Sequence, residues 1–99
     1  MRVTIIADDA AVYVDGLALW PIDLTGLSSD IHAVQWYDTW GEIEYRSDAN
    51  GQRPPNERID DVTAFLPFVN RYNTAKAALP VPTPAVTSSS TGAVRVIAG

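Results

Sequence analysis

The 99-residue sequence contains no cysteine, which excludes disulfide bonds, thiolate nucleophiles and cysteine-ligated zinc. It contains one histidine, His32, and the acidic residues show no spacing that would complete a metal site around it. The six glycines are isolated, so no glycine-rich phosphate-binding loop is present. We therefore expect no metal ion and no other cofactor.

Long hydrophobic runs are also missing. No stretch approaches the length of a membrane span, and Asp8 and Asp9 interrupt the apolar N-terminal run that a signal peptide would need. We expect a protein made in a cytoplasm, with no membrane partner. Seven basic residues against twelve acidic ones give a net charge of −5, and the basic residues are scattered. Nucleic-acid binding needs several cations on one surface, so we expect no nucleic-acid partner.

What is present is typical of one small globular domain. Hydrophobic residues make up 46% of the chain and charged residues 19%. Three tryptophans, four tyrosines and two phenylalanines can fill a core that short aliphatic side chains could not. The pattern described below predicts an α+β domain at residues 1–79 and an extended arm at residues 80–99.

The segment 31–46 predicts the β-hairpin around which the domain is organised. Two runs rich in β-branched and aromatic residues flank the turn sequence DTWG at 38–41. With these four residues as the loop, Trp36 faces Ile43 and Val34 faces Tyr45. Alternation then gives one apolar face with Val34, Trp36, Ile43 and Tyr45, and one polar face with Gln35, Glu42, Glu44 and Arg46.

A first hairpin is predicted at residues 2–15, with its turn at Asp8-Asp9. Its core-facing pairs would be Ile5 with Val12 and Val3 with Val14, and a slip by one residue would scatter them. A short strand follows at 17–20 and is ended by a proline. Three apolar side chains of the next loop are expected to pack on the domain: Ile22, Leu24 and Leu27. The segment 47–56 is rich in turn formers and is predicted to be an exposed loop.

Residues 60–79 change from a period of two to one of about 3.6, which predicts a helix. The expected apolar stripe contains Val62, Phe65, Leu66, Val69, Tyr72 and Ala75. Asp60 or Asp61 is a candidate N-cap. Pro67 indicates either a kink or a single turn at 61–65 followed by the main helix from Pro67. The fold class is therefore α+β: a small antiparallel β-meander sheet of about four to five strands, packed by one C-terminal helix.

The arm at 80–99 differs in composition from the rest of the chain. PVPTP favours polyproline geometry, VTSSSTG is typical of a spacer, and AVRVIAG is strand-like. The last run could pair with an exposed sheet edge of a neighbouring chain, or fold back on its own sheet. Trp40 lies in the predicted turn, so it is either an exposed contact residue or a side chain that folds over the sheet edge. The candidate partner-binding residues are Trp40, Pro82, Pro84, Val94, Val96 and Ile97.

Candidate catalytic chemistry is sparse. His32 and Asp30 lie two residues apart and could form a hydrogen-bonded pair, but no nucleophile accompanies them in a recognisable motif. The paired acids have structural explanations: Asp8-Asp9 as a turn, Asp60-Asp61 as a cap, and Glu42 with Glu44 as a solvated strand face. We therefore predict no catalytic residue.

Four strings carry a resemblance over about residues 1–79: VTIIADDAAVYVDG, IHAVQWYDTWGEIEY, RPPNERI and DDVTAFLPFV. Together they resemble small bacteriophage proteins encoded among tail and tail-fibre genes. The resemblance implies a structural or adaptor protein of the tail, fibre or neck region, made in the bacterial host cytoplasm and located in the virion. Its partners would be other virion proteins, in several copies within a symmetric assembly. The alternatives are a transient, chaperone-like assembly factor that is not retained in the virion, and a small enzyme that uses His32.

Overall fold

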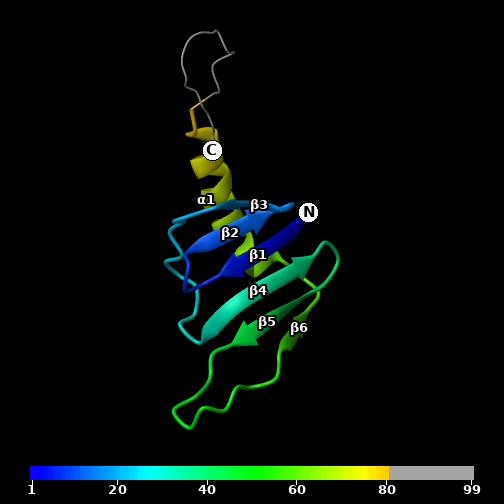
Figure 1. Cartoon of the computed structure of the whole chain (residues 1–99). Helices are drawn as coiled ribbons and strands as arrows, with labels where there is room; N and C mark the ends of the chain where they lie inside the picture. Colours follow the sequence, from blue (N-terminus) through cyan, green and yellow to red (C-terminus); the bar gives the residue numbers. More distant parts are fainter. Residues whose placement is uncertain (81–99) are drawn as a thin grey trace.

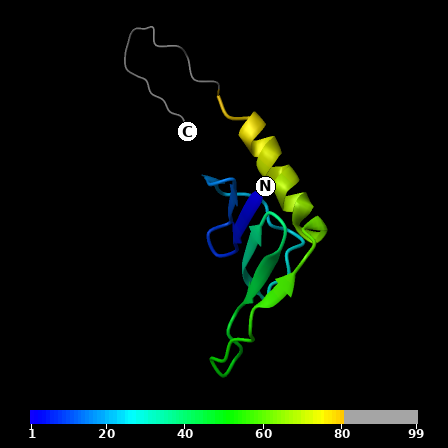
Figure 2. The ribbon, with the colours of Figure 1, turned by 90° about the vertical axis from the view of Figure 1, so that its right-hand side faces the viewer.

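The computed structural model describes residues 1–80, which form one six-stranded antiparallel sheet and one α-helix (Figure 1). In chain order the elements are β1 Arg2–Ile6, β2 Ala11–Val14, β3 Leu17–Leu19, β4 Ile31–Tyr37, β5 Gly41–Tyr45, β6 Glu57–Ile59, the 3₁₀ turn η1 Thr63–Phe65 and α1 Leu66–Ala77. The helix lies on one side of the sheet (Figure 2). The predicted α+β class, an antiparallel sheet packed by one C-terminal helix, is confirmed.

The sheet differs from the prediction in two details. Its strand order is β3-β2-β1-β4-β5-β6, so the chain leaves β3, passes β2 and β1, and returns to pair β4 with β1. This connection interrupts the expected meander. A sixth strand, β6, pairs with β5 directly after the exposed 47–56 loop, where the sequence shows no strand pattern.

The first hairpin has the predicted register, with Ile5 opposite Val12 and Val3 opposite Val14. All four side chains lie on the face that α1 covers, and the first three listed here are the most deeply buried: Ile5, Val12, Val3 and Val14. Each pair buries apolar surface from both strands at once, so the hydrophobic pattern fixes the register.

The predicted register of the central hairpin is wrong by two residues. Val34 faces Ile43, and Trp36 faces Gly41. The loop is shorter than expected, because the Tyr37 amide donates to the carbonyl oxygen of Trp40 at 2.7 Å. A shift of two residues keeps every side chain on its expected face, since side chains alternate with a period of two. The apolar face is therefore as predicted even though the partners are not.

A β-bulge at His32 changes the start of β4. Ile31 faces Tyr45 and Ala33 faces Glu44, which leaves His32 as the extra residue. Strict alternation from Val34 would place Ile31 on the polar face, but the bulge returns it to the core, where it is 7% exposed. Simple alternation along residues 31–37 also predicts His32 on the face of Val34; the bulge interrupts this alternation, and His32 has no Cα partner in β5.

The helical region follows the second of the two predicted arrangements. A single 3₁₀ turn precedes α1, and Pro67 lies in the first turn of α1, where its missing amide costs nothing. Phe68 joins the buried face although it was not in the predicted stripe, because it lies three residues after Phe65 and four before Tyr72, on the same face of the helix. The buried side chains of this region are Phe65, Phe68, Val69 and Tyr72.

Two polar contacts fix this region to its surroundings. The Tyr72 hydroxyl donates to the carbonyl oxygen of Leu17 in β3 at 2.9 Å, which ties α1 to the sheet edge. The Asp61 carboxylate accepts bonds from the Thr63 hydroxyl and amide, at 2.6 and 2.9 Å. The N-cap residues of η1 and α1, Val62 and Phe65, make no side-chain cap bond, so Asp61 organises the approach to the helix and does not cap it.

Candidate protein-interaction surface

The only histidine lies in an exposed ion-pair cluster. His32 Nδ1 is 3.6 Å from an Asp8 carboxylate oxygen, and Arg46 Nη1 is 2.7 Å from the other. Arg46 Nε also donates to the carbonyl oxygen of Ser29 at 3.0 Å. The carboxylate beside His32 is therefore that of Asp8, and the hydrogen-bonded pair with Asp30 that the sequence suggested does not form among the described residues. The side chains of His32, Asp8 and Arg46 are 40–56% exposed, a setting in which water screens their interaction.

The other paired acids also have local partners. Asp60 accepts bonds from the Arg58 guanidinium at 3.1 and 3.2 Å. The bonds from the Thr63 hydroxyl and amide hold the pKa of Asp61 below its ordinary value. Within residues 1–80, no group of three or more histidine, cysteine, aspartate or glutamate side chains is placed to hold a metal ion.

Trp40 folds over the β6 edge of the sheet. Its ring centroid lies 4.8 Å from that of Tyr37, and the Arg58 guanidinium lies 4.6 Å from the centroid of the Trp40 ring. Arg2 lies 5.5 Å from the centroid of the Tyr37 ring. Trp40 is half-buried, and these neighbours reduce the area of its ring that a partner could contact. Its role in partner binding remains a prediction.

Among residues 1–80, the most exposed large apolar side chain is instead Trp20, with 68% of its surface accessible. It follows β3 directly and precedes Pro21, to which it is joined by a cis peptide bond. Leu17, at the start of β3, and Leu79, just beyond α1, are 48% and 41% exposed. Sequence reasoning missed Trp20 because it placed this residue inside the short strand. The proline that follows Trp20 could have indicated that this tryptophan lies at the end of the strand, outside the sheet.

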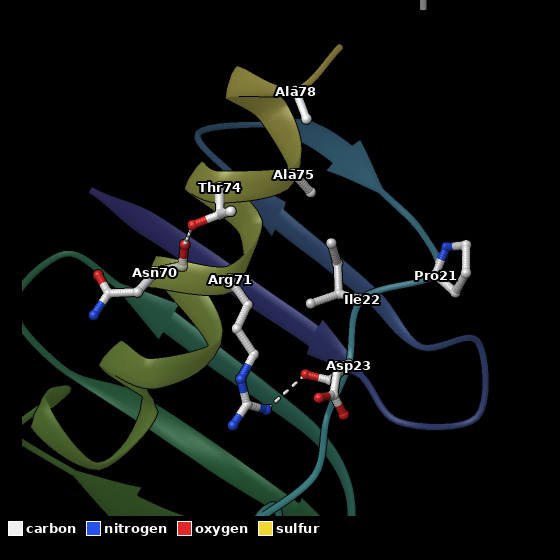
Figure 3. A pocket seen from close by; sticks show the side chains of 8 residues that line it. All are labelled: Pro21, Ile22, Asp23, Asn70, Arg71, Thr74, Ala75 and Ala78. Atoms are coloured by element: carbon white, nitrogen blue, oxygen red, sulfur yellow. Dashed lines mark hydrogen bonds between the residues drawn. The ribbon is translucent and has the colours of Figure 1, made fainter.

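A hollow of about 390 Å³ lies between α1 and residues 21–23, the segment that directly follows Trp20 in the chain (Figure 3). We call it the α1 hollow; it is lined by Pro21, Ile22, Asp23, Asn70, Arg71, Thr74, Ala75 and Ala78. The small side chains of Ala75 and Ala78 leave the space open on the helix side. Figure 3 shows Pro21 and Ile22 on the opposite wall.

The charged groups of the α1 hollow are already engaged. Arg71 Nη1 donates to the carbonyl oxygens of Asp23 and Thr25, at 2.7 and 2.8 Å, and so links α1 to the loop. Bonds from the Thr25 hydroxyl and amide lower the pKa of Asp23. Two polar residues, Asn70 and Thr74, also line the hollow, and the Thr74 hydroxyl donates to the Asn70 carbonyl oxygen at 3.0 Å. The rest of the wall is apolar, and in the chain it adjoins Trp20 through Pro21 and Leu79 through Ala78.

The sheet face opposite α1 has a different character. In the row that crosses its centre, the Thr4 hydroxyl donates to Gln35 at 2.7 Å, and Glu42 and Arg58 continue the row toward β6. Tyr13, 38% exposed, faces Thr4 from the other side. This face is mostly polar, as predicted for a solvated surface. The exposed apolar groups therefore point to the β3–α1 end as the candidate interaction surface.

The predicted partner-binding residues Pro82, Pro84, Val94, Val96 and Ile97 lie outside the described residues. Comparison of the chain with protein-family models, with curated proteins and with solved structures gave no match. In the part of the chain that the structure describes, no helix has the length and hydrophobicity needed to cross a membrane. A function for this chain therefore has to be argued from its surface and its sequence.

Proposed function

We propose that this protein is a structural or adaptor component of a bacteriophage particle, located in the tail, fibre or neck region. It binds neighbouring virion proteins through its C-terminal arm and through the surface from which that arm departs. The supporting observation is that Trp20 and Leu79 are both exposed and are the chain neighbours of Pro21 and Ala78, which line the α1 hollow.

The energetics favour a partner for this surface. Burial of apolar surface contributes about 25 cal/mol per Å², and an aromatic side chain buries about 150–250 Å² when it is fully covered. Exposed apolar groups that are contiguous mark interaction sites more often than those that are scattered. Trp20 is exposed and is joined directly to Pro21, which lines the hollow, so residues 1–80 leave a useful contact surface accessible at this end of the domain.

The phage setting follows from the resemblance of residues 1–79 to small proteins encoded among tail and tail-fibre genes. Such components occur in several copies within symmetric assemblies. The proposal assigns no catalytic residue, and its partners are virion proteins and neither nucleic acid nor membrane. The scattered basic residues and the net charge of −5 support the exclusion of nucleic acid.

The test is mass spectrometry of phage particles washed at high salt. We expect this chain at a constant ratio to the tail proteins, and we expect a chain that stops at Leu79 to be lost from the particles. A matched Tyr13→Ser variant, changed on the opposite face, should be retained. Absence of the full chain from washed particles would rule out the structural role.

The alternative is a transient assembly factor, which binds a tail or fibre protein and leaves. The acidic composition, with a sequence pI of about 4.5, supports it, because a high net charge keeps a protein soluble while it holds an aggregation-prone partner. Presence in the lysate together with absence from the virion would favour this alternative. Failure of particle assembly without the chain would then distinguish a factor from a bystander.

A further inference from the structure

The α1 hollow is elongated along the helix. Its helical wall runs from Asn70 to Ala78, which at 1.5 Å per residue is about 12 Å. Pro21 and Ile22 form the apolar part of the opposite wall, and Trp20 stands exposed beside them. Proline-containing segments in extended conformation dock in apolar grooves that aromatic side chains line. The aromatic residue available here is Trp20, which directly precedes Pro21 of the hollow and is exposed.

This chain carries such a segment. The described residues end at Pro80, two residues beyond Ala78, and the sequence continues with VPTP at 81–84. Each proline fixes its own φ and restricts the preceding residue to extended backbone. At about 3.1 Å per residue, four residues in polyproline geometry span about 12 Å, which equals the length of the α1 hollow.

The backbone restriction that the prolines impose also disfavours binding of residues 81–84 in the hollow of their own chain. To enter it, the chain would have to reverse direction within a few residues of Ala78, whose amide still bonds to the carbonyl oxygens of Thr74 and Ala75. Leu79, Val81 and Thr83 each precede a proline, so the helical backbone that a tight reversal needs is disfavoured at all three. A tight reversal of this segment into the hollow of its own chain is therefore disfavoured.

We propose that the α1 hollow receives residues 81–84 of a second copy of this chain. The inference rests on the proposed role of the arm in binding a neighbour, and it identifies that neighbour. Each copy then supplies one segment and one hollow, which is the arrangement that closed symmetric assemblies use. Trp20 of the receiving copy packs against the prolines of the incoming segment.

The charge distribution of the molecule is compatible with the binding of an uncharged segment, residues 81–84, from a second copy. Two copies with a net charge of −5 each repel one another at long range, so a contact between them forms best through uncharged groups. VPTP carries no charge, and Arg71 is held by two carbonyl oxygens of its own chain. Added salt screens the repulsion and leaves the apolar contact intact, so association should strengthen between low and moderate ionic strength.

The experiment is sedimentation equilibrium of the full chain over a range of concentrations. We expect self-association that is lost in a chain stopped at Leu79. Ala78→Lys places a long charged side chain in the hollow and should raise the dissociation constant at least tenfold, and Trp20→Ser should do the same. Ala77→Lys, at an exposed neighbouring position that does not line the hollow, and Tyr13→Ser, on the opposite face, should leave the dissociation constant unchanged.

Other results would overturn the inference. A full chain that is monomeric at every concentration means that the arm is made for a different protein, and the washed-particle measurement then decides separately whether the proposed function stands. A monomer in which Trp20 is less accessible to a quencher than in the shortened chain means that the segment occupies its own hollow. Equal weakening by Ala77→Lys and Ala78→Lys means that the hollow is not the contact.

Discussion

Gly41→Ala is the substitution for which the structure predicts the largest loss of stability, because the added methyl group would clash with backbone atoms. Gly41 opens β5 directly opposite Trp36, and its backbone is not in the left-handed region. A Cβ built at this position would lie well inside 3.0 Å of the Gln35 carbonyl oxygen, and at 3.0 Å from both Cα and Cε3 of Trp36. Because the oxygen and the Cα belong to the backbone, the strands themselves would have to separate.

The cost follows from what must move. Inserting one methyl group into a well-packed region costs about 1–3 kcal/mol, and we expect about 3 kcal/mol because no flexible side chain can absorb the clash. The Trp36 ring would also be displaced from the core, where it is 6% exposed. For a domain of this size, 1 kcal/mol corresponds to about 4–8 °C in melting temperature, so we expect Tm to fall by at least about 12 °C.

Gly51→Ala is the matched control. Gly51 has a φ of +77°, and nothing lies within 4 Å of a Cβ at that position. Its substitution therefore costs only backbone strain, about 1 kcal/mol. Urea unfolding of both full-length variants, followed by tryptophan fluorescence, measures the difference. The close-approach argument is refuted if Gly41→Ala lowers the midpoint no more than Gly51→Ala does.

Three further changes test other contacts. Tyr72→Phe removes a part-buried hydrogen bond to a β3 carbonyl, so the free energy of unfolding should fall by about 1 kcal/mol in urea titrations; an unchanged midpoint would show that this bond contributes nothing. Asp61→Ala removes a carboxylate whose pKa is lowered by the bonds from Thr63. The stability that this carboxylate contributes is complete above its ordinary pKa of 3.8 and is lost as the pH falls through the lower pKa of the folded state. The melting temperatures of variant and parent should therefore converge below about pH 4, and a difference that does not depend on pH would contradict this. His32→Ala should change stability by less than about 0.5 kcal/mol because the side chain is exposed, whereas deletion of His32 removes the bulge and turns Ile31 out of the core, so equal effects in thermal melts would argue against the bulge.

The sequence was most informative where two independent patterns agreed. In the first hairpin, the turn at Asp8-Asp9 and the pairing of Val3 with Val14 required the same register, and the structure has that register. In the central hairpin, hydrophobic alternation predicted the faces but not the partners. A loop of two residues and one of four give the same faces, and the choice between them depends on the Tyr37–Trp40 backbone bond, which leaves no trace in composition.

The missed features depend on contacts between distant segments. The bulge at His32 allows Ile31 to be buried in the core. The free energy of this burial cannot be inferred from the local alternation of polar and apolar residues. β6 forms because β5 offers a free edge, since the sequence ERI at 57–59 has little strand propensity of its own. Local propensity was overridden in both places by pairing and packing, which the chain determines only as a whole.

The candidate surface was mislocated for a related reason. A tryptophan in a turn is a reasonable guess for an exposed side chain, but Arg58 and Tyr37 come from other strands to cover Trp40. Within residues 1–80, no aromatic ring or guanidinium packs on Trp20 in this way, because the chain leaves β3 through Pro21 and carries the next residue, Ile22, into the core. Exposure of an aromatic side chain is therefore set by which strands lie beside it, and strand order was the part of the fold that the sequence did not show.

The two edges of the sheet explain why the β3–α1 end is the one suited to a partner. β6 presents Glu57 and Arg58, and charges on an edge strand oppose pairing with another chain. β3 presents no charge in LAL, but its length of three residues and the Tyr72 bond to its first carbonyl limit what another strand could pair with. Strand addition is thus disfavoured at both edges by different means. The side chains that stay accessible at the β3 end are those around the α1 hollow, so a partner there has to be bound by side-chain packing, which is how an extended proline-containing segment binds.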